Sequence, residues 1–239
     1  MRDPLQLGLG VVTVALAGAA AYTIGAYAAT EGLGLGVVKR GPSRAMVALT
    51  FDDGPDPEHT PRILDVLAAA GVRATFFMVG RQVDAAGAVA RAVAAAGHDV
   101  GNHTYGHRHL WTLSPAASAA EVDRGADAIA GAIGVTPRYF RPPWGTFNWA
   151  AYARAAQLGE RRILWSVRPE GLIAAAPAPR MTALVVGKAH PGAIVNLHDR
   201  GGHPSTPKET CAALPGMIAG LRGRGFEIVP LRALLSSLA

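Results

Sequence analysis

Two pairs of side chains in this 239-residue chain have the types and spacing that metal chemistry requires. Asp52 and Asp53 are adjacent in the motif TFDDGP, and His103 and His107 stand four positions apart in HTYGH. Buried neighbouring carboxylates are costly unless a cation lies near them. Two imidazoles at this spacing share one face if the segment is helical, and with one carboxylate they make a catalytic metal site with open positions. The pattern therefore indicates a bound divalent cation.

Other polar residues could serve the same centre. A divalent cation lowers the pKa of water, so an aspartate that does not bind the cation can accept the proton. Arg141, in RPPWG, could keep that carboxylate ionised and oriented. His198, in LHD, follows a buried run and suits a general acid. His109 is a rival metal ligand because it stands close to His103 and His107 in the sequence.

Alternating strand and helix patterns are expected to position these side chains. Residues 45–51 are rich in β-prone side chains and predict a strand that ends at the aspartate pair. Residues 60–71 predict a helix, with Thr60 as its N-cap and Gly71 after its end. Similar units follow to the end of the chain and indicate an α/β fold with a parallel sheet. Roughly seven such units favour a small barrel, whose active site lies at the carboxyl ends of the strands.

The composition of the chain argues against several function classes. The formal net charge is +6, yet no run of five Lys or Arg residues and no interleaved aromatic residues occur, so nucleic-acid binding is not expected. A basic balance instead suits lipid headgroups or an acidic cell-wall polymer. No phosphate-binding glycine motif opens a predicted helix. The single cysteine, Cys211, cannot form an internal disulfide.

The first 30 residues stand apart from the remainder. Residues 5–30 carry no charged side chain and are long enough to span a bilayer, which predicts an apolar N-terminal helix. AYAA at 26–29 fits a signal-peptide cleavage site, so a signal anchor and a cleaved signal peptide both stay open. Residues 31–44 are glycine-rich and basic. We therefore expect an anchor or signal peptide at 1–30, then a tether, and a globular domain at 45–239.

The four motifs TFDDGP, HTYGH, RPPWG and LHD, in this order, resemble those of the polysaccharide deacetylases with a NodB-homology domain, carbohydrate esterase family 4. The resemblance extends over roughly residues 45 to 235. It implies a distorted (β/α) barrel and the hydrolysis of an N-acetyl group, sometimes an O-acetyl group, on a polymeric sugar. It also implies that Asp53, His103 and His107 bind the metal. Zinc is the leading candidate for that ion, and cobalt, manganese and nickel suit the same ligands.

The resemblance implies a role for the other matched residues. Asp52 resembles the general base, and Arg141 the residue that orients it. His198 resembles the general acid that protonates the leaving amine. Trp144 stands where a backbone N–H of the family helps to stabilise the oxyanion, and Leu197 stands where the family lines its acetyl pocket.

One motif departs from the family pattern. SVRPEGL (166–172) occupies the place where the family commonly has an aspartate followed by a tryptophan. Gly171 and Leu172 stand at those two positions, so the carboxylate that orients the catalytic histidine is missing. We expect Glu170, one residue earlier, to reach back towards His198 in its place.

The expected function is a metal-dependent hydrolase that removes N-acetyl groups from an N-acetylglucosamine-containing polysaccharide, a cell-wall glycan or a chitin-like oligosaccharide. Such polymers lie outside the membrane, which favours an extracytoplasmic protein, membrane-anchored or secreted. Lys39, Arg40 and Arg44 give an excess of positive charge after the apolar stretch. Because positive flanks tend to stay inside the cell, this excess taken alone would place the domain in the cytoplasm. Two alternatives stay open: a non-catalytic membrane-anchored barrel that binds glycan, and an amidase that acts on a small non-sugar substrate.

Overall fold

A parallel sheet forms the centre of the protein, in a computed structural model that describes residues 13–14, 17–169, 176–201 and 207–236. Within these residues the strands run in the order β5-β4-β3-β2-β1-β6, and β7 pairs with β1 outside this path. Every pairing between these strands is parallel. The strands are β1 Met46–Asp52, β2 Thr75–Met78, β3 Asp99–Asn102, β4 Tyr139–Phe140, β5 Arg161–Arg162, β6 Ala193–His198 and β7 Glu227–Ile228.

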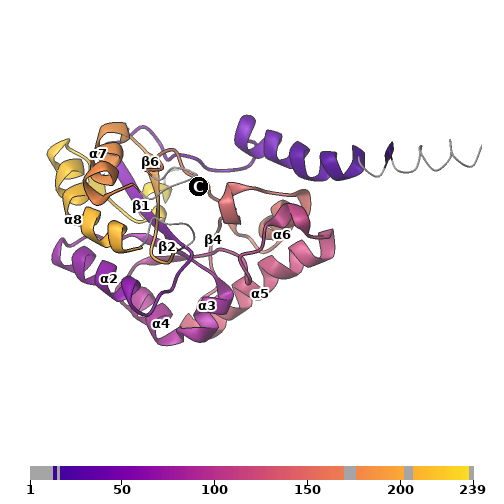
Figure 1. Cartoon of the computed structure of the whole chain (residues 1–239), viewed down its shortest axis with the longest axis horizontal. Helices are drawn as coiled ribbons and strands as arrows, with labels where there is room; N and C mark the ends of the chain where they lie inside the picture. The colour runs from indigo at the N-terminus through magenta and orange to yellow at the C-terminus, as the bar shows by residue number, and fades with distance from the viewer. Residues whose placement is uncertain (1–12, 15–16, 170–175, 202–206, 237–239) are drawn as a thin grey trace, which may run out of the picture.

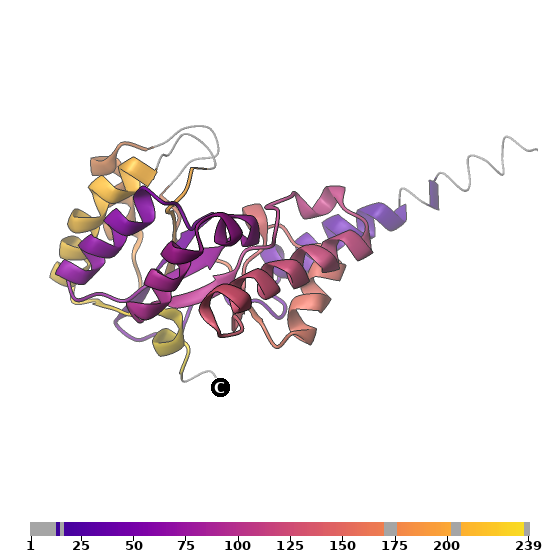
Figure 2. The same ribbon diagram turned by 90° about the horizontal axis from the view of Figure 1, so that it is seen from below.

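Helices surround the sheet (Figure 1). Helices α2, α7 and α8 lie together beside β1 and β6, whereas α5 and α6 pack against each other at the far end of the molecule (Figures 1 and 2). The helices are α2 His59–Ala69, α3 Gly80–Ala85, α4 Gly87–Ala95, α5 Pro115–Ile133, α6 Trp149–Gln157, α7 Ala178–Lys188, α8 Pro207–Gly223 and α9 Leu231–Leu234. Helices that follow parallel strands are the βα units that the sequence predicts.

The sheet curves into a distorted barrel. The sequence predicts a strand over residues 161–167, but β5 ends at Arg162. Val38 lies beside the next residues, where its N–H donates to Arg162 O at 2.8 Å and its carbonyl accepts from Leu164 N at 2.9 Å. Further along the chain, Val167 forms an isolated parallel β-bridge with Val195 of β6. The predicted α/β barrel is confirmed.

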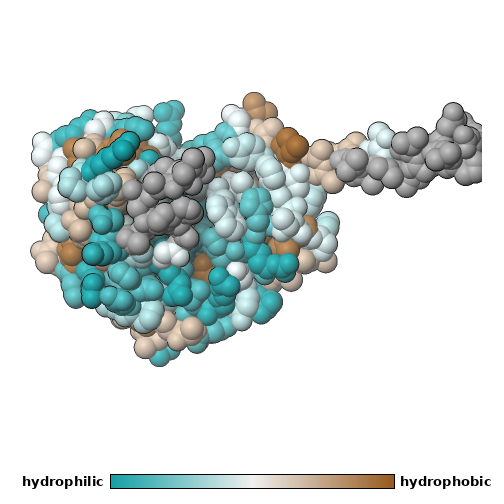
Figure 3. Space-filling view, in the orientation of Figure 1, coloured by the Kyte–Doolittle hydropathy of each residue, from teal (hydrophilic) through white to brown (hydrophobic). Residues whose placement is uncertain are grey.

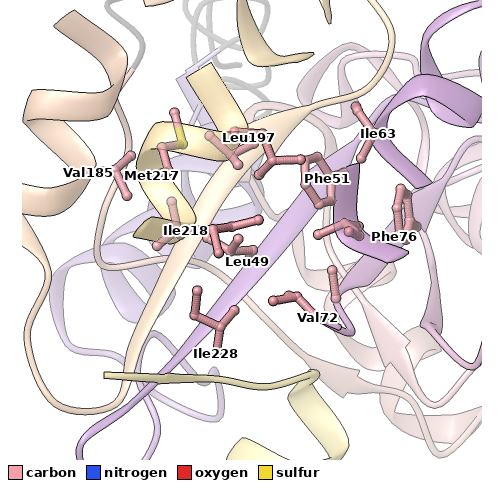
Figure 4. Packing of buried hydrophobic residues seen from close by; sticks show 14 of the residues in the cluster. Leu49, Phe51, Ile63, Val72, Phe76, Val185, Leu197, Met217, Ile218 and Ile228 are labelled. Atoms are coloured by element: carbon pink, nitrogen blue, oxygen red, sulfur yellow. The ribbon is translucent and has the colours of Figure 1, made fainter. Parts of the chain in front are cut away.

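Strand β1 separates the hydrophobic core from the polar side of the sheet by simple alternation. Phe51 packs in the main core cluster with Leu197 and Met217 (Figure 4). Thr50 and Asp52 project from the opposite face, because neighbouring side chains alternate along a strand. A core side chain of this size contributes roughly 1.5–3 kcal/mol when it is fully buried. A register slip of one residue would exchange the two faces, so burial fixes where the polar residues point.

Helix α2 begins differently from the prediction. The carboxylate of Asp56 accepts hydrogen bonds from the backbone N–H groups of Glu58 and His59, at 3.0 and 2.8 Å. Thr60 is therefore not the N-cap, because the helix has already begun at His59. Its hydroxyl instead donates to Asp199 Oδ2 at 2.6 Å. The predicted cap is wrong, and Thr60 supports the strand end of β6.

The N-terminal segment packs against the domain where the structure describes it. Residues 17–20 are helical, and two π-helical turns follow at Ala21–Gly25 and Ala28–Gly32. Ala26 is fully buried in a hydrophobic cluster that includes residues of α6. The predicted continuous apolar helix falls partly outside the described residues and stays a prediction. None of the helices in the described ranges is both long enough and apolar enough to cross a membrane.

Candidate active site

The carboxyl ends of four strands bring the motifs together. Asp52 is the last residue of β1, and its register partner on the adjacent strand β6 is His198. His103 directly follows β3, which lies on the other side of β2. Arg141 directly follows β4, the neighbour of β3. Parallel strands end at the same edge of a sheet, so residues up to 146 positions apart in the sequence become neighbours.

Asp53, His103 and His107 form a cluster with the geometry of a metal site. Asp53 Oδ1 lies 3.4 Å from His103 Nε2 and 2.9 Å from His107 Nε2. One ligand atom from each residue lies within 4.8 Å of the other two. The two histidines lie in a loop, so their proximity does not come from the helical spacing that the sequence left open. Left-handed backbone at Thr104 (φ 66°) and His107 (φ 51°) turns the loop and brings both rings to the carboxylate.

The hydrogen bonds around this cluster fit a cation. His103 Nδ1 lies 2.6 Å from the carbonyl oxygen of Arg141, which can only accept, so Nδ1 carries the proton. In the neutral ring, Nε2 then directs a lone pair towards Asp53. Asp53 Oδ1 is buried and has no hydrogen-bond partner among the described residues. Two lone-pair donors and an unsatisfied carboxylate oxygen that face one another are the arrangement a divalent cation stabilises.

The charge state of Asp53 agrees with this role. Burial alone would raise its pKa, but the neighbouring His103 and His107 rings hold the pKa of the carboxyl well below its usual value. The group is therefore ionised across the physiological range, as a metal ligand must be.

Asp52 is held by both of its carboxylate oxygens. Oδ1 accepts from Arg141 Nη1 at 2.6 Å, and Oδ2 accepts from Asn196 Nδ2 at 2.7 Å. Arg141 is fully buried and also donates to Thr50 Oγ1 at 2.8 Å and to Leu164 O at 3.1 Å. Burial lowers the pKa of the guanidinium, and the charge of Asp52 opposes that effect. The pair fixes a carboxylate beside the cluster in one orientation.

Asn196 is a site residue that sequence reasoning missed. In β6 it stands two residues before His198, so both side chains project from the same face of the strand. The available signal was this period of two, in a run that otherwise consists of apolar residues before the histidine. Leu197, between them, is fully buried in the main core cluster on the opposite face (Figure 4). The structure does not bring Leu197 to the site, and its contact with an acetyl group stays a prediction.

An aromatic wall borders the cluster. The ring of Trp144, which is 53% exposed, lies 4.6 Å from the ring of His107 and 5.1 Å from that of His109. His109 Nδ1 accepts from the backbone N–H of Trp111 at 3.3 Å, and His109 is not part of the three-residue cluster. Its rival role as a ligand is not supported by this geometry. The part of the Trp144 backbone in oxyanion binding stays a prediction.

Asp199 is a second residue that sequence reasoning left unassigned. Its Oδ2 accepts from Thr60, and its backbone N–H donates to Asp52 O at 3.2 Å. Burial, and then the nearby charges of Asp53 and Asp52, raise the pKa of Asp199 to about 7. A Cβ at Gly54 would lie 2.2 Å from Asp199 Oδ2, so the turn after the aspartate pair needs glycine for this close approach. Asp199 thus braces that turn.

The expected substitute for the missing orienting carboxylate lies outside the described residues. This applies to Glu170, and equally to Gly171 and Leu172, where the sequence departs from the family pattern. The reach of Glu170 towards His198 therefore stays a prediction.

Comparison with known proteins decides the family. The family model described as polysaccharide deacetylase matches residues 39–163, which is more than half of the chain. The chain belongs to the polysaccharide deacetylase family. The resemblance carried by the four motifs is confirmed, and with it the expected class of enzyme, a hydrolase that deacetylates polysaccharides.

Individual relatives of this deacetylase support the same assignment. A chitooligosaccharide deacetylase of Bradyrhizobium sp. (strain ANU 289) is 39% identical over 196 residues, which cover 77% of this chain and 88% of the relative. A peptidoglycan-N-acetylglucosamine deacetylase of Bacillus cereus is 35% identical over 191 residues, which cover 80% of this chain and 88% of the relative. A crystal structure of a peptidoglycan N-acetylglucosamine deacetylase in complex with a substituted benzamide matches with a TM-score of 0.78 at 29% identity, over 87% of this chain and 96% of the other.

The buried carboxyl of Glu160 is expected to make the stability of the protein depend on pH. Asn102 directly precedes His103 in the chain, and its Nδ2 donates a hydrogen bond to Glu160 Oε1 at 3.1 Å. Burial raises the pKa of Glu160 from 4.5 to about 8. A carboxyl with a raised pKa in the folded state binds more protons there than in the unfolded chain. Its contribution to stability is therefore complete below pH 4.5 and is lost as the pH rises through about 8.

We expect Glu160→Gln, which keeps the shape without the charge, to remove part of this loss. The melting temperature of the variant should exceed that of the wild type by about 2–4 °C or more at pH 9, the effect of about 1 kcal/mol, and should not do so at pH 5. Thermal unfolding from pH 5 to pH 9 measures it, with Glu58→Gln as a control because that side chain is 62% exposed. Parallel pH profiles for the wild type and Glu160→Gln would contradict the prediction.

Proposed function

We propose that this protein is a metal-dependent deacetylase that removes N-acetyl groups from an N-acetylglucosamine-containing glycan, either a cell-wall glycan or a chitin-like oligosaccharide. The observation that carries the proposal is the buried, unsatisfied Oδ1 of Asp53, which faces two imidazole nitrogens beside the separately held carboxylate of Asp52. The names of two relatives support this substrate class: one is a chitooligosaccharide deacetylase and the other a peptidoglycan-N-acetylglucosamine deacetylase.

The residues of this chain divide the reaction among them. Asp53, His103 and His107 would hold the metal ion, for which zinc is the leading candidate. When bound, a divalent cation polarises water and the acetyl carbonyl. Asp52 would accept the proton of the attacking water, which adds to the carbonyl carbon. His198 would then give a proton to the departing nitrogen as the C–N bond breaks, which leaves acetate and a free amine.

The contacts around Asp52 suit a base of this kind. Arg141 and Asn196 each occupy one carboxylate oxygen, so the group keeps one orientation before substrate arrives. Because Asp52 and His198 are register partners on adjacent strands, base and acid can reach the same acetamido group. Trp144, exposed at the rim, offers an aromatic surface to a sugar ring.

We also propose that the N-terminal segment is retained and anchors the protein to a membrane, on the extracytoplasmic side where such glycans lie. Cleavage after residue 29 would remove Ala26, which is fully buried in a cluster with residues of α6. It would also remove Ala21, whose carbonyl accepts from Trp149 Nε1 at 3.1 Å. A segment that completes the packing of the domain is better explained as part of the mature protein than as a discarded signal peptide.

Acetate release across a panel of substrates tests the proposed function. We expect release from chitooligosaccharides or peptidoglycan fragments when a divalent metal is supplied, and loss of release with a chelator. Release from a small N-acetylated amide alone would favour the amidase alternative. No release from any substrate by the metal-loaded protein would favour a barrel that only binds glycan.

A further inference from the structure

Exposed large apolar side chains gather along the N-terminal segment and the start of α6. Leu33 is 74% exposed, Ile24 57% and Leu35 55%, and the aromatic side chains of Tyr27 and Trp149 are each 41% exposed. We call these five residues the apolar face. Figure 3 shows hydrophobic side chains gathered where the N-terminal segment meets the domain. Single apolar side chains are ordinary on a protein surface, whereas a contiguous patch marks an interaction site.

Two hydrogen bonds attach the N-terminal segment, which carries four of the five residues of the apolar face, to α6, which carries the fifth. At one end, Trp149 Nε1 donates to Ala21 O at 3.1 Å. At the other, the Tyr152 hydroxyl donates to Leu35 O at 3.3 Å. The segment is therefore attached to the domain at two points and does not behave as a loose tether between them.

The surroundings of the apolar face favour lipid as its partner. Residues 5–30, which include Ile24 and Tyr27, carry no charge and lead directly into the face. Tyrosine and tryptophan side chains concentrate at the headgroup level of membranes. Arg40 and Arg44 follow the face in the sequence and are exposed, which suits anionic headgroups.

We propose that the apolar face lies in the headgroup layer of an anionic bilayer and holds the reaction centre beside the membrane. This inference rests on the proposed retention of the N-terminal anchor. It adds that the domain itself touches lipid, in one fixed orientation, and is not suspended at the end of a flexible linker.

A series of ring contacts connects the apolar face to the site. Tyr27 meets Trp111 edge-on at 5.7 Å, and Trp111 meets His109 at 5.7 Å. His109 stacks on Trp144 at 5.1 Å, and Trp144 lies 4.6 Å from the ring of His107. The ring of His107 is thus connected to Tyr27 of the apolar face through three intervening rings. The substrate class that follows is a glycan strand linked to the membrane or lying against it, and not a polymer distant from the bilayer.

Tryptophan fluorescence can test the contact with lipid. The full chain is placed in vesicles of phosphatidylglycerol and phosphatidylethanolamine whose acyl chains carry bromine, which quenches tryptophan at close range. We expect quenching in the wild type and the loss of most of it in Trp149→Phe. Trp165→Phe is the matched control, because Trp165 packs against two interior clusters of the domain, and its loss should leave the quenching in place.

A second pair of variants separates contact with lipid from anchoring. Removing a leucine from an apolar environment changes an equilibrium by about tenfold or more. Leu33→Ser/Leu35→Ser should therefore reduce the quenching of Trp149 and the rate on glycan linked to vesicles, while the rate on a soluble oligosaccharide stays unchanged. Val135→Ser is the control, since Val135 is 59% exposed after α5, away from the apolar face. It should change neither quantity.

The outcomes distinguish the two proposals. If the protein floats with the vesicles but Trp149 is not quenched, the anchor stands and contact of the apolar face with lipid is refuted. If the full chain does not float with the vesicles at all, the anchor fails and this inference fails with it. If Val135→Ser has the same effect as the double serine variant, the response is not specific to the face and the inference is also overturned.

Discussion

His103→Ala is expected to abolish both metal retention and deacetylase activity. The ring is 2% exposed and supplies one of three clustered ligand atoms, and its other nitrogen is fixed by the carbonyl of Arg141. Asp53→Ala should have the same effect, because it removes the only carboxylate of the cluster. The fold should survive, since His103 and Asp53 follow their strands instead of packing in the core. Elemental analysis, acetate release and circular dichroism of the purified variants measure the three quantities.

His109→Ala is the matched control for this experiment. It removes an imidazole that lies close to the cluster but belongs to an aromatic wall with Trp144 and Trp111. Metal content should therefore stay near that of the wild type. Full metal occupancy in His103→Ala, together with loss in His109→Ala, would move the site to the rival histidine and refute the assignment.

Asp52→Asn is expected to separate the base from the ligands. The variant should retain its metal, because Asp52 is not in the three-residue cluster. Its rate should fall by about 10²–10⁴, the usual contribution of a general base. An asparagine of the same shape can still accept from Arg141, which limits the damage to the buried guanidinium. The metal content of the variant and its kcat are compared with those of the wild type, on a chitooligosaccharide that the wild type deacetylates at a measurable rate.

Two results would count against that role. Near-normal turnover by Asp52→Asn would show that the attacking water needs no carboxylate base. Loss of metal along with activity would show that Asp52 and Asp53 act together as ligands. Asp84→Asn is a suitable control for the chemical change, because its carboxylate bonds to the Tyr105 hydroxyl at an exposed position.

The alternation of strands and helices along the chain, and the placement of the motifs at strand ends, could be predicted from the sequence because both depend on local patterns. Residues 45–51 are β-prone and end at a polar pair, and the structure places β1 at Met46–Asp52. Helix α5 begins after Ser114, whose side chain caps it, and ends at Gly134 in the left-handed conformation. These features depend on residues close in the chain, so propensity and capping rules suffice to locate them.

The errors concern features that depend on distant contacts. Thr60 looks like an N-cap, but its hydroxyl bonds to Asp199, 139 positions later. Asn196 holds Asp52 from 144 positions away, and the period of two that it shares with His198 does not reveal which residue it contacts. The spacing of the histidine pair would place both rings on one face only in a helix, whereas positive φ angles at Thr104 and His107 bring the rings together in a loop. Register and loop geometry, which tertiary packing decides, account for these differences.

Arg141 connects the two halves of the reaction centre through a single residue. Its guanidinium holds the carboxylate of Asp52, while its carbonyl oxygen holds the ring of His103. A displacement of the loop after β4 is therefore expected to move the carboxylate of Asp52 and the ring of His103 together. We therefore expect the RPPWG segment to be intolerant of insertions. Strand β6 is tied to the same carboxylate through Asn196, so a redesign for a bulkier acyl group has to keep the ends of both β4 and β6 in place.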